Sequence, residues 1–184
     1  YGLINNAARN PKVEDDDFSN NRLENLCLDN FQKDLDVGLI GSTLCAKYFG
    51  RLIADNPEGG IIINISSDLG LIAPNQNIYI KDKSSKHKPV KPISYSIIKT
   101  GIIGLTRYLA TYWNKNNVRC NALCPGGVEN NQDEEFRGKL EKLIPLERMA
   151  KKDEYKSTII WMLSPNTSYL NGAVISVDGG RTVW

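Results

Sequence analysis

The chain has 184 residues, of which 41% are apolar and 24% are charged, and its formal net charge is +2. This composition is typical of a globular domain with a core and excludes a disordered chain. No apolar run approaches the roughly 20 residues of a membrane-spanning helix, and no signal peptide is visible. The slight positive charge gives no reason to expect nucleic acid as a partner. We therefore expect a cytoplasmic protein that binds neither membranes nor nucleic acid.

The cysteines are Cys27, Cys45, Cys120 and Cys124, and no two of them form a CxxC pair. His87 is the only histidine, so no His/Cys cluster with metal-ligand spacing exists. Cys120 and Cys124 have strand spacing and are expected to face the same side as small core residues. The sequence predicts reduced thiols.

The first residues, 2–4, read as the end of a buried strand, which is followed by the polar run Asn5-Asn6-Ala7-Ala8. Residues 10–25 are polar and predict a solvated loop, although the three aspartates at 15–17 leave a metal site as an alternative. The chain begins at Tyr1 rather than at a methionine, so we expect it to be part of a longer protein.

A helix is predicted over 29–54, where apolar residues recur at helical spacing. Gly38 and Gly41 interrupt this pattern and indicate close packing against another element. The β-branched run 61–65 predicts a strand that is buried on both faces of a parallel sheet. Ser66 and Ser67 follow its carboxyl end, where open α/β sheets place their sites.

The segment 72–92 breaks the periodicity and is rich in proline and lysine. A charged surface loop is the simpler interpretation; the alternative is a loop that attracts an anionic substrate such as a phosphorylated sugar. Its lysines are Lys81, Lys83, Lys86, Lys88 and Lys91, against one acidic residue, Asp82.

The second half continues to alternate helices and strands. The predicted elements are a helix over 94–116, a strand over 118–124, helices over 132–143 and 152–163, and a strand over 171–177. This order predicts an α/β fold with a doubly wound parallel sheet, of the Rossmann-like kind.

Tyr95 and Lys99 lie four residues apart and therefore share one side of a helical turn. There an ammonium can lower the phenol pKa, and a phenol tuned in this way can exchange a proton with an alcohol oxygen. Since the strand ends of a parallel sheet meet at one edge, we expect Ser67 and the Pro125-Gly126 turn to lie near this pair.

The motifs together resemble the short-chain dehydrogenase/reductase family, in family order over essentially the whole chain. Further segments of the sequence are similar to the flagellin-modification protein A subgroup, which is tied to bacterial sialic-acid-like sugar synthesis. These segments include Ser67–Pro74, Leu105–Trp113 and the end Gly179–Trp184. The family motifs are Asn-Asn-Ala-Ala at 5–8, Asn-Ile-Ser-Ser at 64–67, Tyr-Ser-Ile-Ile-Lys at 95–99, Asn-Ala-Leu-Cys-Pro-Gly-Gly at 121–127 and Val-Asp-Gly-Gly at 177–180.

The resemblance implies an oxidoreductase that interconverts a secondary alcohol and a ketone with NAD or NADP, on a sugar-like small molecule. Tyr95 would be the acid/base, Lys99 would lower its pKa and hold the nicotinamide ribose, and Ser67 would bond the substrate oxygen. Ser66 and Asn5 are assigned to loop capping instead. The cofactor set implied by the resemblance is completed by Asn6 and Ala7 on the adenosine side and by Pro125, Gly126, Val128 and Asn130 around the nicotinamide.

The sequence also departs from the family pattern. The family's catalytic asparagine aligns with Gly38, and the glycine-rich phosphate turn and the residue that decides between NAD and NADP would precede Tyr1. We therefore expect residues 1–184 to form a single domain that lacks the amino-terminal cofactor-binding part. We expect this piece to bind the dinucleotide weakly and to be inactive alone, and the longer protein to be a homotetramer through the helices 29–54 and 94–116.

Two alternatives remain at this point. Gly38 and the missing phosphate turn favour a non-catalytic dinucleotide-binding or scaffold protein derived from the family. A nucleotide-sugar epimerase also uses a tyrosine and a lysine, but it carries a large carboxyl-terminal substrate domain.

Overall fold

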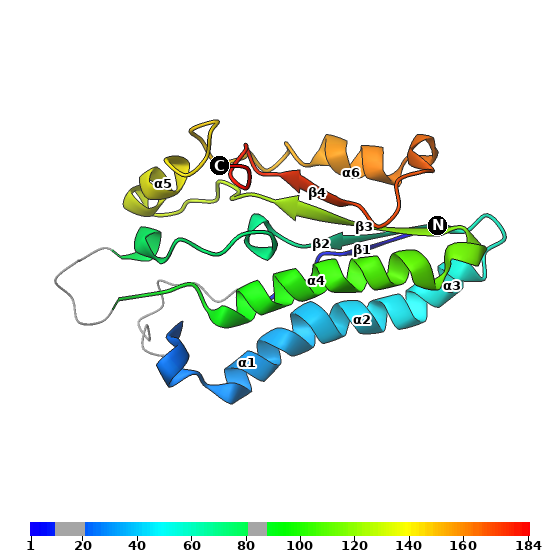
Figure 1. Ribbon diagram of the computed structural model, residues 1–184, viewed down its shortest axis with the longest axis horizontal. Helices are drawn as coiled ribbons and strands as arrows, with labels where there is room; N and C mark the ends of the chain where they lie inside the picture. Colours follow the sequence, from blue (N-terminus) through cyan, green and yellow to red (C-terminus); the bar gives the residue numbers. More distant parts are fainter. Residues whose placement is uncertain (10–20, 81–87) are drawn as a thin grey trace.

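The structure is a computed structural model that describes residues 1–9, 21–80 and 88–184. One parallel sheet of four strands organises it, with the strands side by side in chain order (Figure 1). Each connection between neighbouring strands carries at least one helix, as parallel pairing requires. The predicted α/β fold is confirmed. The strands are β1 (Gly2–Asn5), β2 (Gly60–Ile65), β3 (Val118–Pro125) and β4 (Val174–Val177).

The two faces of the sheet are covered by different helices. A continuous helical run from Leu28 to Ala54 and the helix α4 (Ile93–Tyr112) lie on one face, and α6 (Lys156–Leu163) lies on the other (Figure 1). The run confirms the helix predicted over 29–54, but it contains two π-helical segments. Its parts are α1 (Leu28–Leu35), η3 (Asp36–Ile40), α2 (Gly41–Cys45), η4 (Ala46–Gly50) and α3 (Arg51–Ala54).

Alternation along β2 explains the two cores. Ile62 packs with Ala46 and Leu109 from the first helical layer, whereas Ile61 and Ile63 pack with Met162 of α6. The three isoleucines are fully buried, because a parallel strand between two helical layers has no solvent face.

Glycines set the spacing between the helical layer and its neighbours. A Cβ at Gly38 would lie 2.6 Å from Cγ2 of Ile98 in α4, and a Cβ at Gly50 would lie 2.6 Å from the Trp113 ring. At Gly41 the only neighbour is a carbonyl of the same helical run. The predicted close packing is therefore confirmed at Gly38 and wrong at Gly41.

Several boundaries differ from the sequence-based expectation. The helix predicted over 94–116 begins at Ile93, ends at Tyr112 and is followed by the short turn η7 (Asn114–Asn116). The two helices predicted after β3 are shorter, at α5 (Glu134–Glu141) and α6. The first begins where the Asp133 side chain accepts a hydrogen bond from the Phe136 amide at 3.1 Å.

The segment expected to be a loop before α4 contains a 3-10 turn, η6 (Gln76–Tyr79). The aspartates at 15–17 and three of the lysines, Lys81, Lys83 and Lys86, lie outside the described residues. In the part of the chain that is described, no helix combines the length and apolar character needed to cross a bilayer.

The described thiols fit a structural role. All four cysteines are free, and Cys120 and Cys124 are fully buried. Burial raises the pKa of Cys120 to about 12 and also raises the pKa of Cys124, so neither forms a thiolate near neutral pH.

Candidate active site

A cavity of about 700 Å³ opens at the carboxyl edge of the sheet, on the side toward which the strand arrows point in Figure 1. This is where open parallel sheets place ligands. Helix α5 and the turn η6 border the cavity, joined by the Tyr79 and Phe136 rings at 5.5 Å. Its lining includes Asn6, Ala8, Ser67, Asp68, Tyr95, Lys99, Pro125, Gly126, Val128, Asn130, Gln132, Lys152 and Arg181.

The two serines after β2 have different tasks. Ser66 donates from its hydroxyl to the Lys99 carbonyl at 2.6 Å and so fixes α4 against the end of the strand. Gly70 lets the helix approach, since a Cβ there would lie 2.9 Å from the same carbonyl. Ser67 caps the short turn η5 (Asp68–Gly70) and accepts from the Leu69 amide at 3.2 Å.

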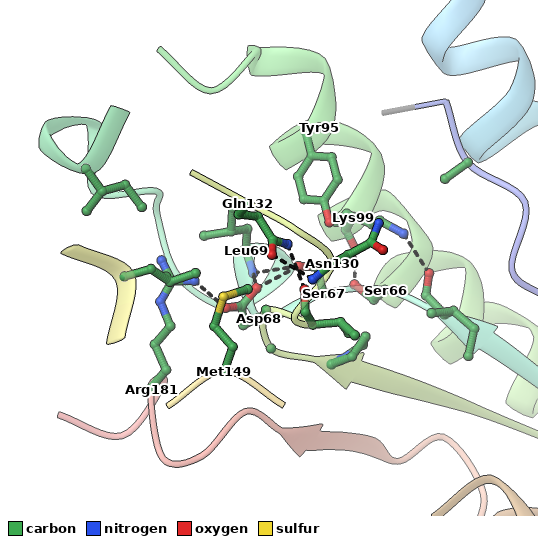
Figure 2. A pocket seen from close by; sticks show the side chains of 18 of the residues that line it. Ser66, Ser67, Asp68, Leu69, Tyr95, Lys99, Asn130, Gln132, Met149 and Arg181 are labelled. Carbon is green, nitrogen blue, oxygen red and sulfur yellow. Dashed lines mark hydrogen bonds and ion pairs between the residues drawn. The ribbon is translucent and has the colours of Figure 1, made fainter. Parts of the chain in front are cut away.

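The Ser67 hydroxyl is oriented by its neighbour. It donates to Oδ1 of Asp68 at 2.7 Å, and the other carboxylate oxygen of Asp68 pairs with Arg181 at 2.5 Å. Both charged side chains are buried. Figure 2 shows Arg181 reaching up to Asp68, with Ser67 between this pair and the Tyr95 side chain.

Arg181 reaches the site because the chain reverses after β4. Gly179 and Gly180 have φ angles of +68° and +92°, which favour glycine. Asp178 holds the turn by accepting from the amides of Gly180 and Thr182 at 2.9 and 3.0 Å. The Asp-Gly-Gly sequence thus directs the next side chain back to the sheet edge.

Tyr95 points its hydroxyl into the cavity toward Ser67 (Figure 2). Burial raises the pKa of Tyr95; a hydrogen bond with Ser67 opposes this, the charge of Asp68 adds to it and Arg181 opposes it. The lowering of this pKa by Lys99, which the resemblance implies, stays a prediction. The phenol is protonated at neutral pH.

Lys99 lies one helical turn after Tyr95, with its ammonium 5.7 Å from the centre of the phenol ring. The ammonium donates to the Ile65 carbonyl at 3.0 Å, and burial lowers the pKa of Lys99. A second ammonium, that of Lys91, lies closer, 4.0 Å from the same ring centre.

The loop after β3 forms another wall of the cavity. Gln132 holds it by donating to the Val128 carbonyl at 2.8 Å and accepting from the Asn130 amide at 2.7 Å. The Tyr155 hydroxyl donates to the Gly126 carbonyl at 3.2 Å. Gly126, Gly127, Val128, Asn130 and Gln132 of this loop line the cavity.

The structure brings most of the predicted residues to one cavity. Ser67, Tyr95 and Lys99 all line it. From the implied cofactor set, Asn6, Pro125, Gly126, Val128 and Asn130 line the cavity too, whereas Ala7 does not and its neighbour Ala8 does.

Two residues that were assigned to loop capping have other partners. Asn5 donates to the Asn64 side chain at 2.7 Å, and Asn64 in turn donates to Thr106 at 2.9 Å. This chain of bonds ties β1 and β2 to α4. Ser66 anchors α4, as described above, so neither residue caps its loop.

Sequence reasoning missed the Asp68–Arg181 pair and the bracing role of Gln132. The partners in the ion pair are 113 residues apart, so no local spacing relates them. Among the described residues no group of three or more His, Cys, Asp or Glu side chains is arranged to hold a metal ion.

The chain is similar to known dehydrogenases and reductases. One curated relative is the glucose 1-dehydrogenase 2 of Bacillus subtilis, which is 33% identical over 164 residues, covering 86% of this chain and 58% of the relative. Another is the NADH-dependent L-xylulose reductase of Ambrosiozyma monospora, which is 31% identical over 164 residues, covering 84% of this chain and 56% of the relative. The crystal structure of a short-chain dehydrogenase from Leptospira borgpetersenii with bound NAD+ superimposes with a TM-score of 0.80 at 28% identity, covering 99% of this chain and 65% of that one.

The chain spans between 55 and 66% of the length of the curated relatives it matches. Residues 83–182, more than half of the chain, match the family model described as enoyl-(acyl carrier protein) reductase. The chain belongs to the short-chain dehydrogenase/reductase family.

Proposed function

We propose that this chain carries the catalytic residues of an NAD(P)-dependent oxidoreductase that interconverts a secondary alcohol and a ketone. The observation that carries the proposal is the meeting of Ser67, Tyr95 and Lys99 at one cavity, from two separate elements of the sheet edge. A proton donor, a hydroxyl and an ammonium in one site are the groups that carbonyl reduction needs.

Tyr95 gives its proton to the carbonyl oxygen in reduction and takes a proton from the alcohol in oxidation. Its raised pKa keeps the phenol protonated at neutral pH, which suits reduction. Ser67 positions the substrate oxygen beside the phenol. The nicotinamide, when bound, supplies or accepts the hydride.

The residues present fit the nicotinamide half of such a cofactor. The Lys99 ammonium offers donors for ribose hydroxyls, and the Asn130 amide offers a donor and an acceptor for a carboxamide. Gly126 lets this loop pack closely against the turn after β4, because a Cβ there would lie 2.8 Å from the Asp178 backbone. Pro125, Val128, Asn6 and Ala7 complete the proposed cofactor set.

We further propose a sugar-like substrate. The support is that relatives named for glucose and L-xylulose are 33% and 31% identical to this chain. The sequences of Ser67–Pro74 and Gly179–Trp184 support membership of the flagellin-modification subgroup. We propose that the protein acts in carbohydrate synthesis in the cytoplasm.

A self-association face accompanies this proposal. Exposed apolar side chains follow the outer side of the helical run 28–54, and more lie on α4 beside it. We propose that these helices pack against a second copy in a homotetramer. The residues are Val37, Ile40, Leu44, Tyr48, Phe49 and Leu52 in the run, with Ile97, Tyr108 and Tyr112 in α4.

The test is Tyr95→Phe in the full-length protein, which removes the reacting hydroxyl and keeps the ring. Turnover of NADH with L-xylulose, or of NAD(P)+ with glucose, should fall by about a hundredfold or more, because general acid catalysis contributes this much. Tyr169→Phe is the matched control, because that side chain is fully exposed and is not part of the cavity lining.

Equal turnover by Tyr95→Phe and by the control would contradict the assignment of Tyr95 as the acid/base. Cofactor binding without turnover by the unmodified protein, over a panel of sugars, would favour the alternative of a non-catalytic binding protein. That alternative is motivated by Gly38, which stands where the family has a catalytic asparagine.

A further inference from the structure

The first turn of α4 carries the proposed acid/base, and its own sequence holds it weakly. Pro92 stands at the amino-terminal cap and makes no side-chain hydrogen bond, so the turn has no cap of the usual kind. The Ser66 hydroxyl fixes the helix at the Lys99 carbonyl, one turn beyond Tyr95. Because helix ends without caps fray, the position of the phenol depends on a second anchor before Tyr95.

Asp34 in α1 supplies that anchor. The Ser94 hydroxyl, one residue before the acid/base, donates to Oδ2 of Asp34 at 2.7 Å, and both side chains are buried. α1 and the start of α4 lie side by side (Figure 1). The helix dipole favours a carboxylate beside the amino-terminal end of a helix, and a hydrogen bond to a carboxylate is of the strong, charge-assisted kind. The contact therefore fixes the turn that carries Tyr95.

The other oxygen of Asp34 contacts a different segment. In the described part of the chain Oδ1 accepts no aligned hydrogen bond, and its charge is compensated by the Arg9 guanidinium at 3.2 Å. Arg9 donates from the same nitrogen to the Asn30 carbonyl at 3.4 Å. Asp34 is only 4% exposed, and a buried carboxylate is costly without a cation, so its charge holds Arg9 in place.

Arg9 belongs to the loop after β1, which contributes to the cavity. Asn6 and Ala8 of this loop line the cavity, and Arg9 follows directly. The proposed function places the adenosine side of the cofactor at this loop. One buried carboxylate thus joins the loop that would hold the cofactor to the helical turn that carries the acid/base.

We propose that Asp34 is a positioning residue, which fixes the proposed acid/base through Ser94 and the loop after β1 through Arg9. The inference rests on the proposed function and adds to it a residue outside the cavity lining. The two oxygens of the carboxylate act on different steps. The contact with Ser94 affects the chemical step, and the contact with Arg9 affects the binding of the dinucleotide.

The first variant of the full-length protein tests the contact with the helix. Ser94→Ala removes the donor and keeps the Arg9 ion pair. With L-xylulose or glucose as substrate, kcat should fall by about tenfold or more, because a small displacement of a reacting group costs this much. The Kd for NADH or NADPH, measured by nicotinamide fluorescence, should stay unchanged. Thr111→Val is the control, since it removes a hydroxyl that donates to the Tyr108 carbonyl on an exposed part of the same helix.

The second variant makes the opposite change. Arg9→Met/Asp34→Asn removes both charges together, so no unpaired carboxylate is left in the interior, and the asparagine oxygen still accepts from Ser94. The dinucleotide Kd should rise by about tenfold, because the loop must then be ordered on binding, whereas kcat should stay near that of the parent. Arg22→Met is the matched control for the arginine and should change neither value. The side chain of Arg22 is 41% exposed, against 40% for Arg9, and it pairs with the exposed Glu24.

A role in stability alone gives a different result. It lowers the folded fraction, which chemical denaturation measures, and it does not separate kcat from Kd. Ser94→Ala with the kcat of Thr111→Val overturns the proposal. Arg9→Met/Asp34→Asn with the dinucleotide Kd of Arg22→Met overturns it too, and so do variants that change kcat and Kd together.

Failure of the proposed function has its own signature, in which Tyr95→Phe keeps full turnover or the parent turns over no sugar. The binding measurement needs no turnover, so it then decides the inference. A rise in the dinucleotide Kd of Arg9→Met/Asp34→Asn supports the inference, and a value equal to that of Arg22→Met overturns it.

Discussion

The orientation of the Ser67 hydroxyl is decided by one adjacent carboxylate. The hydroxyl gives its proton to Asp68 and accepts from the Leu69 amide, so what it offers to the cavity is an acceptor. The Tyr95 hydroxyl points toward this oxygen (Figure 2). Asp68 is therefore expected to act on the proposed reaction through Ser67.

A pair of double variants tests this positioning role. Asp68→Asn/Arg181→Gln keeps an acceptor for the Ser67 proton and removes both charges, and kcat should stay within about threefold of the parent. Asp68→Leu/Arg181→Met removes the acceptor and should lower kcat by about tenfold or more. Replacing a whole buried ion pair by apolar side chains is compatible with folding, which circular dichroism would verify.

The control is the same pair of changes in a Ser67→Ala background. There the apolar replacement should cause no further loss, since the hydroxyl that it misorients is absent. An equal loss with and without Ser67 would mean that Asp68 and Arg181 act only on the fold.

The sequence could predict the residues whose position follows from local pattern. Ser67 comes after an apolar strand and Tyr95 and Lys99 share a helical turn, so the rule that strand ends meet brought them together. The position of Arg181 could not be predicted in this way, because its approach to Asp68 depends on the tight turn at Gly179-Gly180. Lys91 is four residues before Tyr95, but Pro92 separates it from the helix, so helical spacing alone does not place it.

Among the elements, the contact between the helical run and α4 gives a physical reason for glycine at position 38. This residue lies in the π-helical segment η3 and is buried against Ile98. An asparagine side chain has no room there while α4 keeps its position. The pattern of apolar residues predicted the helix, but it did not reveal the π segments, because the backbone angles of the residues that flank them stay close to those of an α-helix.

Gly38→Ala should destabilise the protein by about 1–3 kcal/mol, the usual cost of an added methyl group in a packed core. That cost exceeds the roughly 0.5–1 kcal/mol that alanine gains over glycine within a helix. Chemical denaturation measures the difference. Gly138→Ala in α5 is the control, since a Cβ there meets no atom within 4 Å, and it should be neutral or stabilising.

Ile98→Ala supplies the complementary measurement. It removes the atoms that an alanine at position 38 would strike, so in that background Gly38→Ala should cost nothing. An unchanged cost would mean that the helices move apart freely, and that the absence of an asparagine has another physical reason.

For the whole molecule, the sheet separates two kinds of surface. The cavity collects polar and charged groups at one edge, whereas the outer side of the helical run 28–54 exposes large apolar residues such as Leu44 and Phe49. In α4 the exposed rings of Tyr108 and Tyr112 stack 5.5 Å apart. These exposed apolar side chains support the proposed interface, in which a two-fold axis would let the helical layers of two copies cover each other.

The prediction is a change of mass in solution. Leu44→Glu/Phe49→Glu places charges on the outer face without touching the cavity, and light scattering after size exclusion should show a smaller species than for the parent protein. Leu23→Glu, at an exposed apolar residue outside the run, should leave the mass unchanged. A parent protein that is already monomeric at micromolar concentration would show that this face has another use.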